Sequence, residues 1–154
     1  MSPRQPTAAD IAAAALAATA APDPADPAGA VALLADVAGH ASTALFNYRR
    51  NNPTAPDIDR ALNLEMTLDK RAIELRTQAV TLLGAQAADA VARLQDAAGQ
   101  VDAFFGQVAR IEARLTVASA VIGLASAALV GDAGGVLSAV AGVHSALKAA
   151  QATA

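Results

Sequence analysis

Between Arg114 and Lys148 the chain carries a single charged residue, Asp132. Asp132 stands among glycines, and apolar segments of similar length, 115–130 and 136–147, lie on either side of it. Glycine adopts the backbone conformations of tight turns more readily than any other residue. The pattern therefore predicts an apolar helical hairpin within residues 115–150. Its turn is expected to include at least one glycine of positive φ among Gly131, Gly134 and Gly135.

Small residues recur every four positions along both arms of this predicted hairpin. Such spacing lets two helices approach closely and is common in membrane helix pairs. We therefore expect the arms to be held together by Ser119, Gly123, Ala127, Ser138, Gly142 and Ala146. Both arms are shorter than the roughly 20 residues that span a bilayer. Burial in a soluble bundle or oligomer is accordingly favoured over contact with lipid, which stays the alternative.

The composition favours an all-α fold. Apolar residues make up 55% of the chain, but alanine is by far the most frequent of them and aromatic residues reach only 3%. Alanine favours helix, allows close packing and buries little area. Valine, isoleucine and threonine show no alternating run of strand length. We therefore predict an antiparallel bundle of closely spaced helices.

A first helix of this bundle is predicted at residues 28–50. Apolar residues step by three and four along it, and it ends at Arg49 and Arg50, before Pro53. Cations in a last turn suit the helix dipole. Thr54 or Asp57 is expected to cap the next helix, with Pro56 in its first turn. A connection this short predicts antiparallel neighbours.

Apolar residues then recur at a strict spacing of seven, which is typical of coiled coils. The ten positions are Met66, Ile73, Val80, Ala87, Leu94, Val101, Val108, Leu115, Ile122 and Leu129. One unbroken helix over residues 57–130 would extend about 110 Å. The neighbouring helices are too short to cover its middle, so the chain either bends at Gly84, Gly99 or Gly106 or buries the stripe against another copy. We favour a bent, folded bundle whose remaining stripe self-associates through Leu83, Leu94, Val101, Phe104, Phe105, Val108 and Ile111.

The first 27 residues are predicted to form an alanine-rich helix and a proline-rich linker, followed by the bundle at 28–154. The segment around Arg4 and residues 11–21 has the outline of a secretory signal, but an aspartate adjoins its apolar run. A helix from Thr7, with Asp10 three residues later as in a capping box, is favoured instead. The compartment stays open, with the cytoplasm favoured over secretion or membrane association.

Charge and composition argue against several classes of function. A net charge of −3 without a basic, aromatic face speaks against nucleic acid, and the absence of cysteine excludes thiolate chemistry. His40 and His144 are isolated and read as structural. Asp57 and Asp59 suit a helix start better than a carboxylate pair. The glycines around Asp132 lack the lysine of a phosphate loop. The sequence predicts no catalytic residue, metal or cofactor.

Three classes of function follow. We favour a non-enzymatic helical protein that acts as a homo-oligomer, with the hairpin as its assembly or membrane-contact element. The alternative is a soluble adaptor or scaffold that binds another protein's helix. An enzyme of unknown class is the remote third. Long amphipathic helices with an apolar hairpin resemble helical pore-forming proteins in outline, although no motif carries this likeness.

Overall fold

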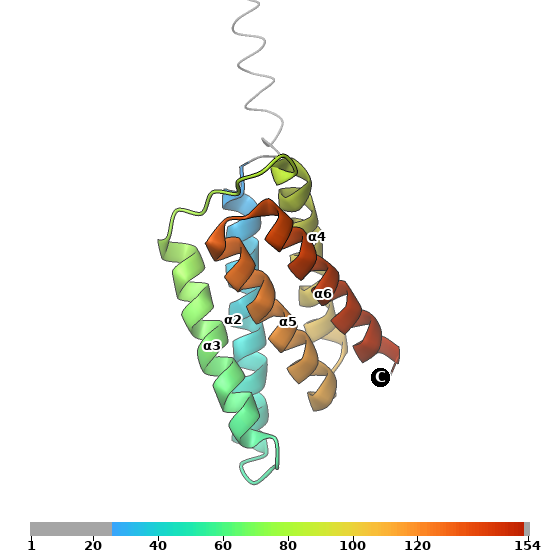
Figure 1. Ribbon diagram of the computed structural model, residues 1–154. Helices are drawn as coiled ribbons and strands as arrows, with labels where there is room; N and C mark the ends of the chain where they lie inside the picture. The colour runs from blue at the N-terminus through green and yellow to red at the C-terminus, as the bar shows by residue number, and fades with distance from the viewer. Residues whose placement is uncertain (1–25, 153–154) are drawn as a thin grey trace, which may run out of the picture.

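The structure, a computed structural model, describes residues 26–152. This part of the chain forms a bundle of five helices and no strand: α2 (Ala28–Asn51), α3 (Ile58–Thr77), α4 (Ala87–Gln107), α5 (Ile111–Val130) and α6 (Ala133–Ala152). Successive helices run in opposite directions (Figure 1). The prediction of an all-α antiparallel bundle is confirmed. The helix predicted from Thr7 lies outside the described residues.

The first two described helices form an antiparallel pair, as the short connection predicts. α2 has Arg49 and Arg50 in its last turn, and the Asn52 amide donates to the carbonyl of Tyr48. The predicted start of the next helix needs a correction. α3 begins only at Ile58, so Pro56 precedes the helix, and Asp57 occupies the N-cap position without a side-chain capping bond.

The long heptad-patterned segment is divided among three helices. It breaks first at residues 78–86, where Gly84 has φ of +126°, and again at residues 108–110, just after Gly106. Gly99 lies inside α4 and does not interrupt it. Two of the three glycines named as weak points therefore mark the breaks, and the chain reverses at each one.

The expectation that the middle of this segment lacks a partner within the chain is wrong. α4 packs against both α2 and α6. Six of the seven residues assigned to self-association are covered by the chain itself. Leu94, Val101, Phe104 and Phe105 are buried, and Val108 and Ile111 pack against the core. Leu83 alone among the seven is exposed.

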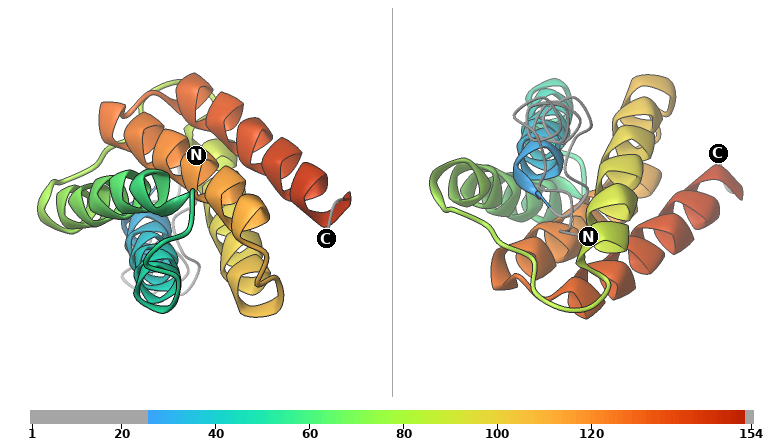
Figure 2. Two further views of the ribbon diagram at one scale, coloured as in Figure 1. Left: turned by 90° about the horizontal axis from the view of Figure 1, so that it is seen from below. Right: turned by 90° about the horizontal axis from the view of Figure 1, so that it is seen from above.

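The row of apolar residues at seven-residue spacing does not form one buried face. Met66 and Ile73 are each 61% exposed on α3, whereas Leu94 and Leu115 are buried. The centre of the bundle is formed where α2 packs against α3, α4 and α5, and where α5 also packs against α3 and α6 (Figure 2). The largest fully buried leucines are Leu34, Leu45, Leu68, Leu94, Leu115 and Leu124.

Candidate functional site

The hairpin turn is present, and Gly131 forms it. This residue caps α5 with φ of +84°, and its amide donates to the carbonyl of Ala127 at 3.2 Å. Gly134 and Gly135 lie in the first turn of α6. The expectation of a glycine with positive φ is therefore met at Gly131 and not at the other two.

Asp132, the single charge between Arg114 and Lys148, is a helix cap. The Asp132 carboxylate accepts a hydrogen bond from the Gly135 amide at 2.8 Å, which satisfies one of the free N–H groups at the start of α6. A negative charge at a helix N-terminus also suits the helix dipole. The backbone N–H groups at the start of α6, which could bind an external anion, therefore face the carboxylate of Asp132 instead.

The connection between α3 and α4 crosses this turn and pairs with it. The Leu83 amide donates to the carbonyl of Gly131 at 2.7 Å, and the Ala133 amide donates to the carbonyl of Leu83 at 2.9 Å. A Cβ atom on Gly131 would lie 2.6 Å from the carbonyl oxygen of Thr81. The hairpin turn is thus fixed to the rest of the bundle through backbone atoms.

The small residues of the two arms do not hold the arms together as predicted. Ser119 and Gly123 of α5 and Ser138 and Gly142 of α6 are exposed. A Cβ atom on Gly123 or on Gly142 would meet nothing within 4 Å. Ala127 and Ala146 are half-buried. α5 and α6 instead bury a different set, which includes Val117, Val121, Leu124, Val136, Val140 and Val143.

Most exposed residues between positions 115 and 147 of the hairpin are small and uncharged. We define the outer hairpin face by seven exposed residues: Thr116, Ser119, Gly123, Val130, Ser138, Gly142 and Ser145. Val130 is the most exposed large hydrophobic residue described, at 80%. None of these seven side chains is charged, although exposed Glu112 lies one turn before Thr116 on α5 and exposed Lys148 lies three residues after Ser145 on α6, so charged side chains border this face.

Two helices, Ala28–Asn51 and Ile111–Val130, are long and apolar enough by length and composition to cross a membrane. About half of the apolar window in the first and 44% of that in the second is buried inside the bundle. Core helices of soluble bundles have the same properties.

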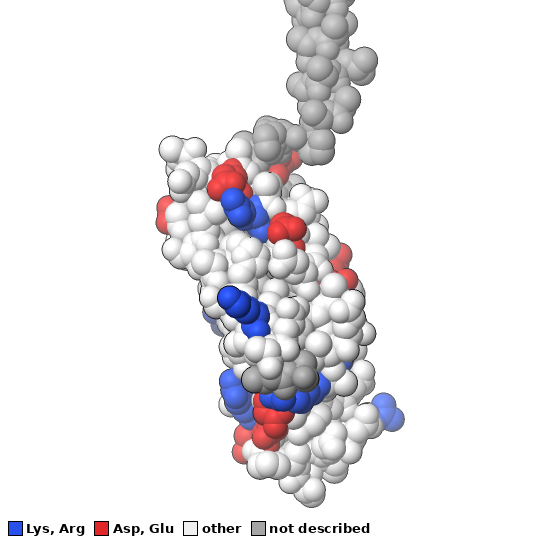
Figure 3. Space-filling view, turned by 90° about the vertical axis from the view of Figure 1, so that its right-hand side faces the viewer, with Lys and Arg blue, Asp and Glu red and all other residues white. Residues whose placement is uncertain are grey.

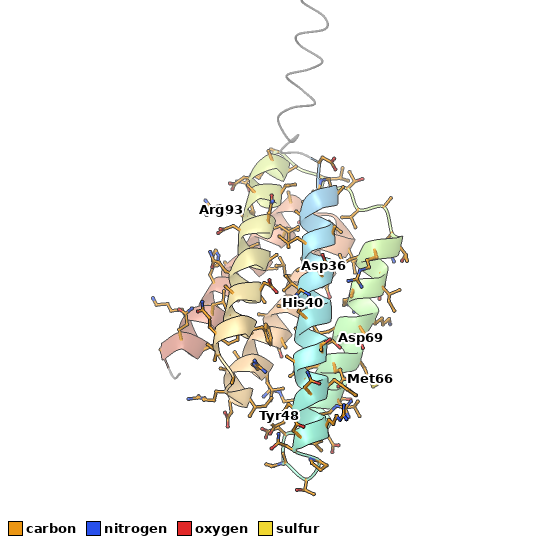
Figure 4. All side chains as sticks on the ribbon, turned by 180° about the vertical axis from the view of Figure 1, so that it is seen from behind. Asp36, His40, Tyr48, Met66, Asp69 and Arg93 are labelled. Atoms are coloured by element: carbon orange, nitrogen blue, oxygen red, sulfur yellow. The ribbon has the colours of Figure 1, made fainter. Side chains whose placement is uncertain are left out.

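The two histidines lie apart. Nδ1 of His40 on α2 is 2.8 Å from a carboxylate oxygen of Asp102 on α4, so it joins two helices at the surface (Figure 4). Nε2 of His144 is buried and has no hydrogen-bond partner. Among the described residues no group of three or more histidine and acidic side chains is placed to hold a metal.

The sequence did not predict which polar side chains join neighbouring helices. Arg49 donates twice to the Glu65 carboxylate, at 2.7 and 3.0 Å, and this pairing raises the pKa of Arg49. Arg49 therefore joins α2 to α3 in addition to ending α2.

Asp57 accepts a hydrogen bond of 3.4 Å from the Tyr48 hydroxyl, and the pKa of Tyr48 is raised by burial and by this carboxylate. Asp57 thus joins the end of α2 to the start of α3, and Asp59 lies in the first turn of α3.

Arg114 closes the sharp reversal between α4 and α5. Its guanidinium donates to the carbonyls of Val108 at 2.7 Å and Phe105 at 3.0 Å, at the end of α4. It also lies 5.8 Å from the centre of the Phe105 ring. Desolvation by the surrounding protein lowers the pKa of Arg114. Arg114, the last cation before the stretch that carries only Asp132, therefore caps the C-terminal end of the neighbouring helix α4.

No protein-family model, curated protein or solved structure matches this chain.

Proposed function

We propose that this is a non-enzymatic helical protein that acts by self-association, with the α5–α6 hairpin as its assembly element. Its apolar stripe on α4 is buried within the chain, so the contact between copies is assigned to the outer hairpin face instead. The observation that carries the proposal is the exposure of small residues at four-residue spacing on both arms, with open space at Gly123 and Gly142.

The chemistry of this face suits another helix. Glycine and serine add little bulk, so a partner helix can approach its backbone to about 8 Å between axes. The exposed Val130 adds apolar area at one end. The same face on a second copy has the same small residues, so a symmetric contact brings small, uncharged side chains of the two copies together.

The test is light scattering on the full chain at high micromolar concentration. Wild type is expected as an oligomer. Gly123→Glu and Gly142→Glu should lower its mass to that of the monomer while helical circular dichroism is kept, because each new side chain points into open space. Gly29→Glu is the matched control, since a Cβ atom on Gly29 also meets nothing within 4 Å.

Vesicles added to the same samples distinguish lipid from a second copy. The charge-free stretch between Arg114 and Asp132, together with the length and hydropathy of α5, is what favours lipid as an alternative. A wild type that is monomeric and floats with vesicles would assign the outer hairpin face to lipid. A monomer that does not float would refute both readings.

A further inference from the structure

A cavity of about 660 Å³ lies between the C-terminal halves of α4 and α6. The two helices pack against each other, and their C-terminal ends point apart (Figure 2). The residues that line the cavity recur every three or four positions, so each helix gives one face to it. They include Gln100, Phe104 and Gln107 of α4 and His144, Leu147 and Lys148 of α6. The volume falls within the range of pockets that hold small organic ligands.

One ring nitrogen in this cavity lacks a partner. Nε2 of His144 is buried and forms no hydrogen bond within residues 26–152. A ring nitrogen that is removed from water without a partner costs free energy in either tautomer, as an unpaired donor or as an unpaired acceptor. A ligand that forms a hydrogen bond with Nε2 would recover this cost.

The charge of the cavity comes from Lys148. This residue lies one turn after His144 on α6, so the two side chains share a face. Lys148 is exposed and forms no ion pair within the described part of the chain, and no acid is among the residues that line the cavity. Beside the cavity, Arg114 donates to carbonyls at the end of α4, which offsets the negative end of that helix. The cavity therefore favours an anion.

The rest of the lining is apolar or neutral, and this decides the kind of anion. Phe104 and Leu147 are buried and form an apolar floor. The polar residues on the α4 side are amides, and that of Gln100 already donates to Asp96 at 2.9 Å. Charged side chains are sparse on the side of the bundle that Figure 3 shows. One ammonium balances one carboxylate, whereas a phosphate dianion would keep a net charge beside the apolar floor.

We propose that the cavity between α4 and α6 binds a small aromatic monocarboxylate. Its carboxylate accepts hydrogen bonds from the Nε2–H of His144 and from the ammonium of Lys148, and the charges strengthen these bonds. Its ring packs on Phe104 and Leu147. The site lies on the side of α6 that packs against α4, whereas self-association is assigned to the outer hairpin face, so neither proposal rests on the other.

The composition of the chain helps a test with 2-naphthoate on the full-length protein. The sequence has no tryptophan, so naphthoate fluorescence is read against little background, and it has two histidines, so the ring of His40 is a reference for that of His144. Fluorescence anisotropy should show saturable binding of one molecule per chain. In nuclear magnetic resonance spectra, naphthoate should shift the ring nitrogen signals of His144 and leave those of His40 in place. Binding that does not saturate, or equal shifts of both histidines, would overturn the proposal.

Two charge reversals test the role of the ammonium. Lys148→Glu should weaken naphthoate binding by about tenfold or more, because it removes one hydrogen bond between charged groups and adds repulsion. Lys70→Glu is the matched control, since Lys70 is exposed on α3 and the change in net charge is the same. It should bind naphthoate as the wild type does. Equal effects of the two substitutions would refute the assignment of Lys148.

Two other compounds test the class of ligand. The alcohol 2-naphthalenemethanol keeps the rings without the charge and should bind about tenfold more weakly than naphthoate. Inorganic phosphate should not displace naphthoate at equal concentration. An alcohol that binds as tightly as naphthoate would show that no carboxylate is recognised, and displacement by phosphate would give the cavity to a different class of anion. Either result would contradict the proposal.

Discussion

At Gly131 the backbone takes a φ of +84°. A Cβ atom added to this residue would lie only 2.6 Å from the carbonyl oxygen of Thr81. These two constraints are independent. Any L-residue is strained in the left-handed region, and contact with a backbone oxygen cannot be relieved by rotating a side chain. The sequence indicated a glycine turn here, but not which glycine carries it, because the contact comes from residues some fifty positions earlier in the chain.

We predict that Gly131→Ala destabilises the protein by more than about 2 kcal/mol, the sum of the left-handed strain and the displaced backbone. Gly134→Ala is the matched control. Gly134 is helical, and a Cβ atom there would lie 3.5 Å from a carboxylate oxygen of Asp132, an ordinary contact. Alanine should therefore be neutral there or stabilise the fold by up to about 1 kcal/mol.

Urea denaturation followed by circular dichroism measures both variants. The opposite ranking, with Gly134→Ala the more harmful, would contradict the turn described here.

The polar contacts also show what a residue pattern leaves out. Arg49 and Glu65 lie on different helices, and their pairing depends on the relative register in which α2 and α3 pack. Arg49 looked sufficient as a helix-terminating cation, and nothing in its neighbourhood identified Glu65. The capping role of Asp132 is easier to infer from the sequence, because this residue directly precedes the start of a helix.

Among the helices, periodicity identified helical segments better than it identified their ends. The seven-residue spacing from Met66 to Leu129 continues through two chain reversals. Alanine, valine and leucine satisfy the spacing whether they lie in one helix or in three. The break at residues 78–86 contains no proline and is stabilised by pairing of Leu83 with the hairpin turn, a contact between elements distant in the chain.

Leu94→Glu tests the revised position of α4. Leu94 is fully buried between helices, so a carboxylate there would be desolvated and unpaired. We predict a loss of at least about 3 kcal/mol, visible as unfolding in circular dichroism. Met66→Glu, at an equivalent position of the seven-residue row but 61% exposed, should change stability by less than about 0.5 kcal/mol.

A Leu94→Glu chain that keeps its helical signal and merely loses mass in light scattering would support the oligomer stripe predicted from the sequence. It would contradict the burial of α4 within one chain.

For the whole molecule, the sequence predicted the all-α class, the antiparallel bundle and the terminal hairpin, because these follow from composition and from one charge-free stretch. It did not predict which side of the hairpin faces outward. That orientation is set by the packing of α5 against α2 and α3, which leaves Gly123 open, and by the packing of α6 against α4 and α5, which leaves Gly142 open.

The central claim is that copies of this chain meet through the outer hairpin face, and crosslinking at one introduced thiol tests it most directly. Gly142→Cys gives the chain a single cysteine on this face. A bismaleimide that reaches about 10 Å, the distance between packed helix axes, should join two copies into a product of twice 15.3 kDa. Gly29→Cys, on another surface, should stay monomeric under the same conditions. Equal yields from the two variants would contradict the proposed interface.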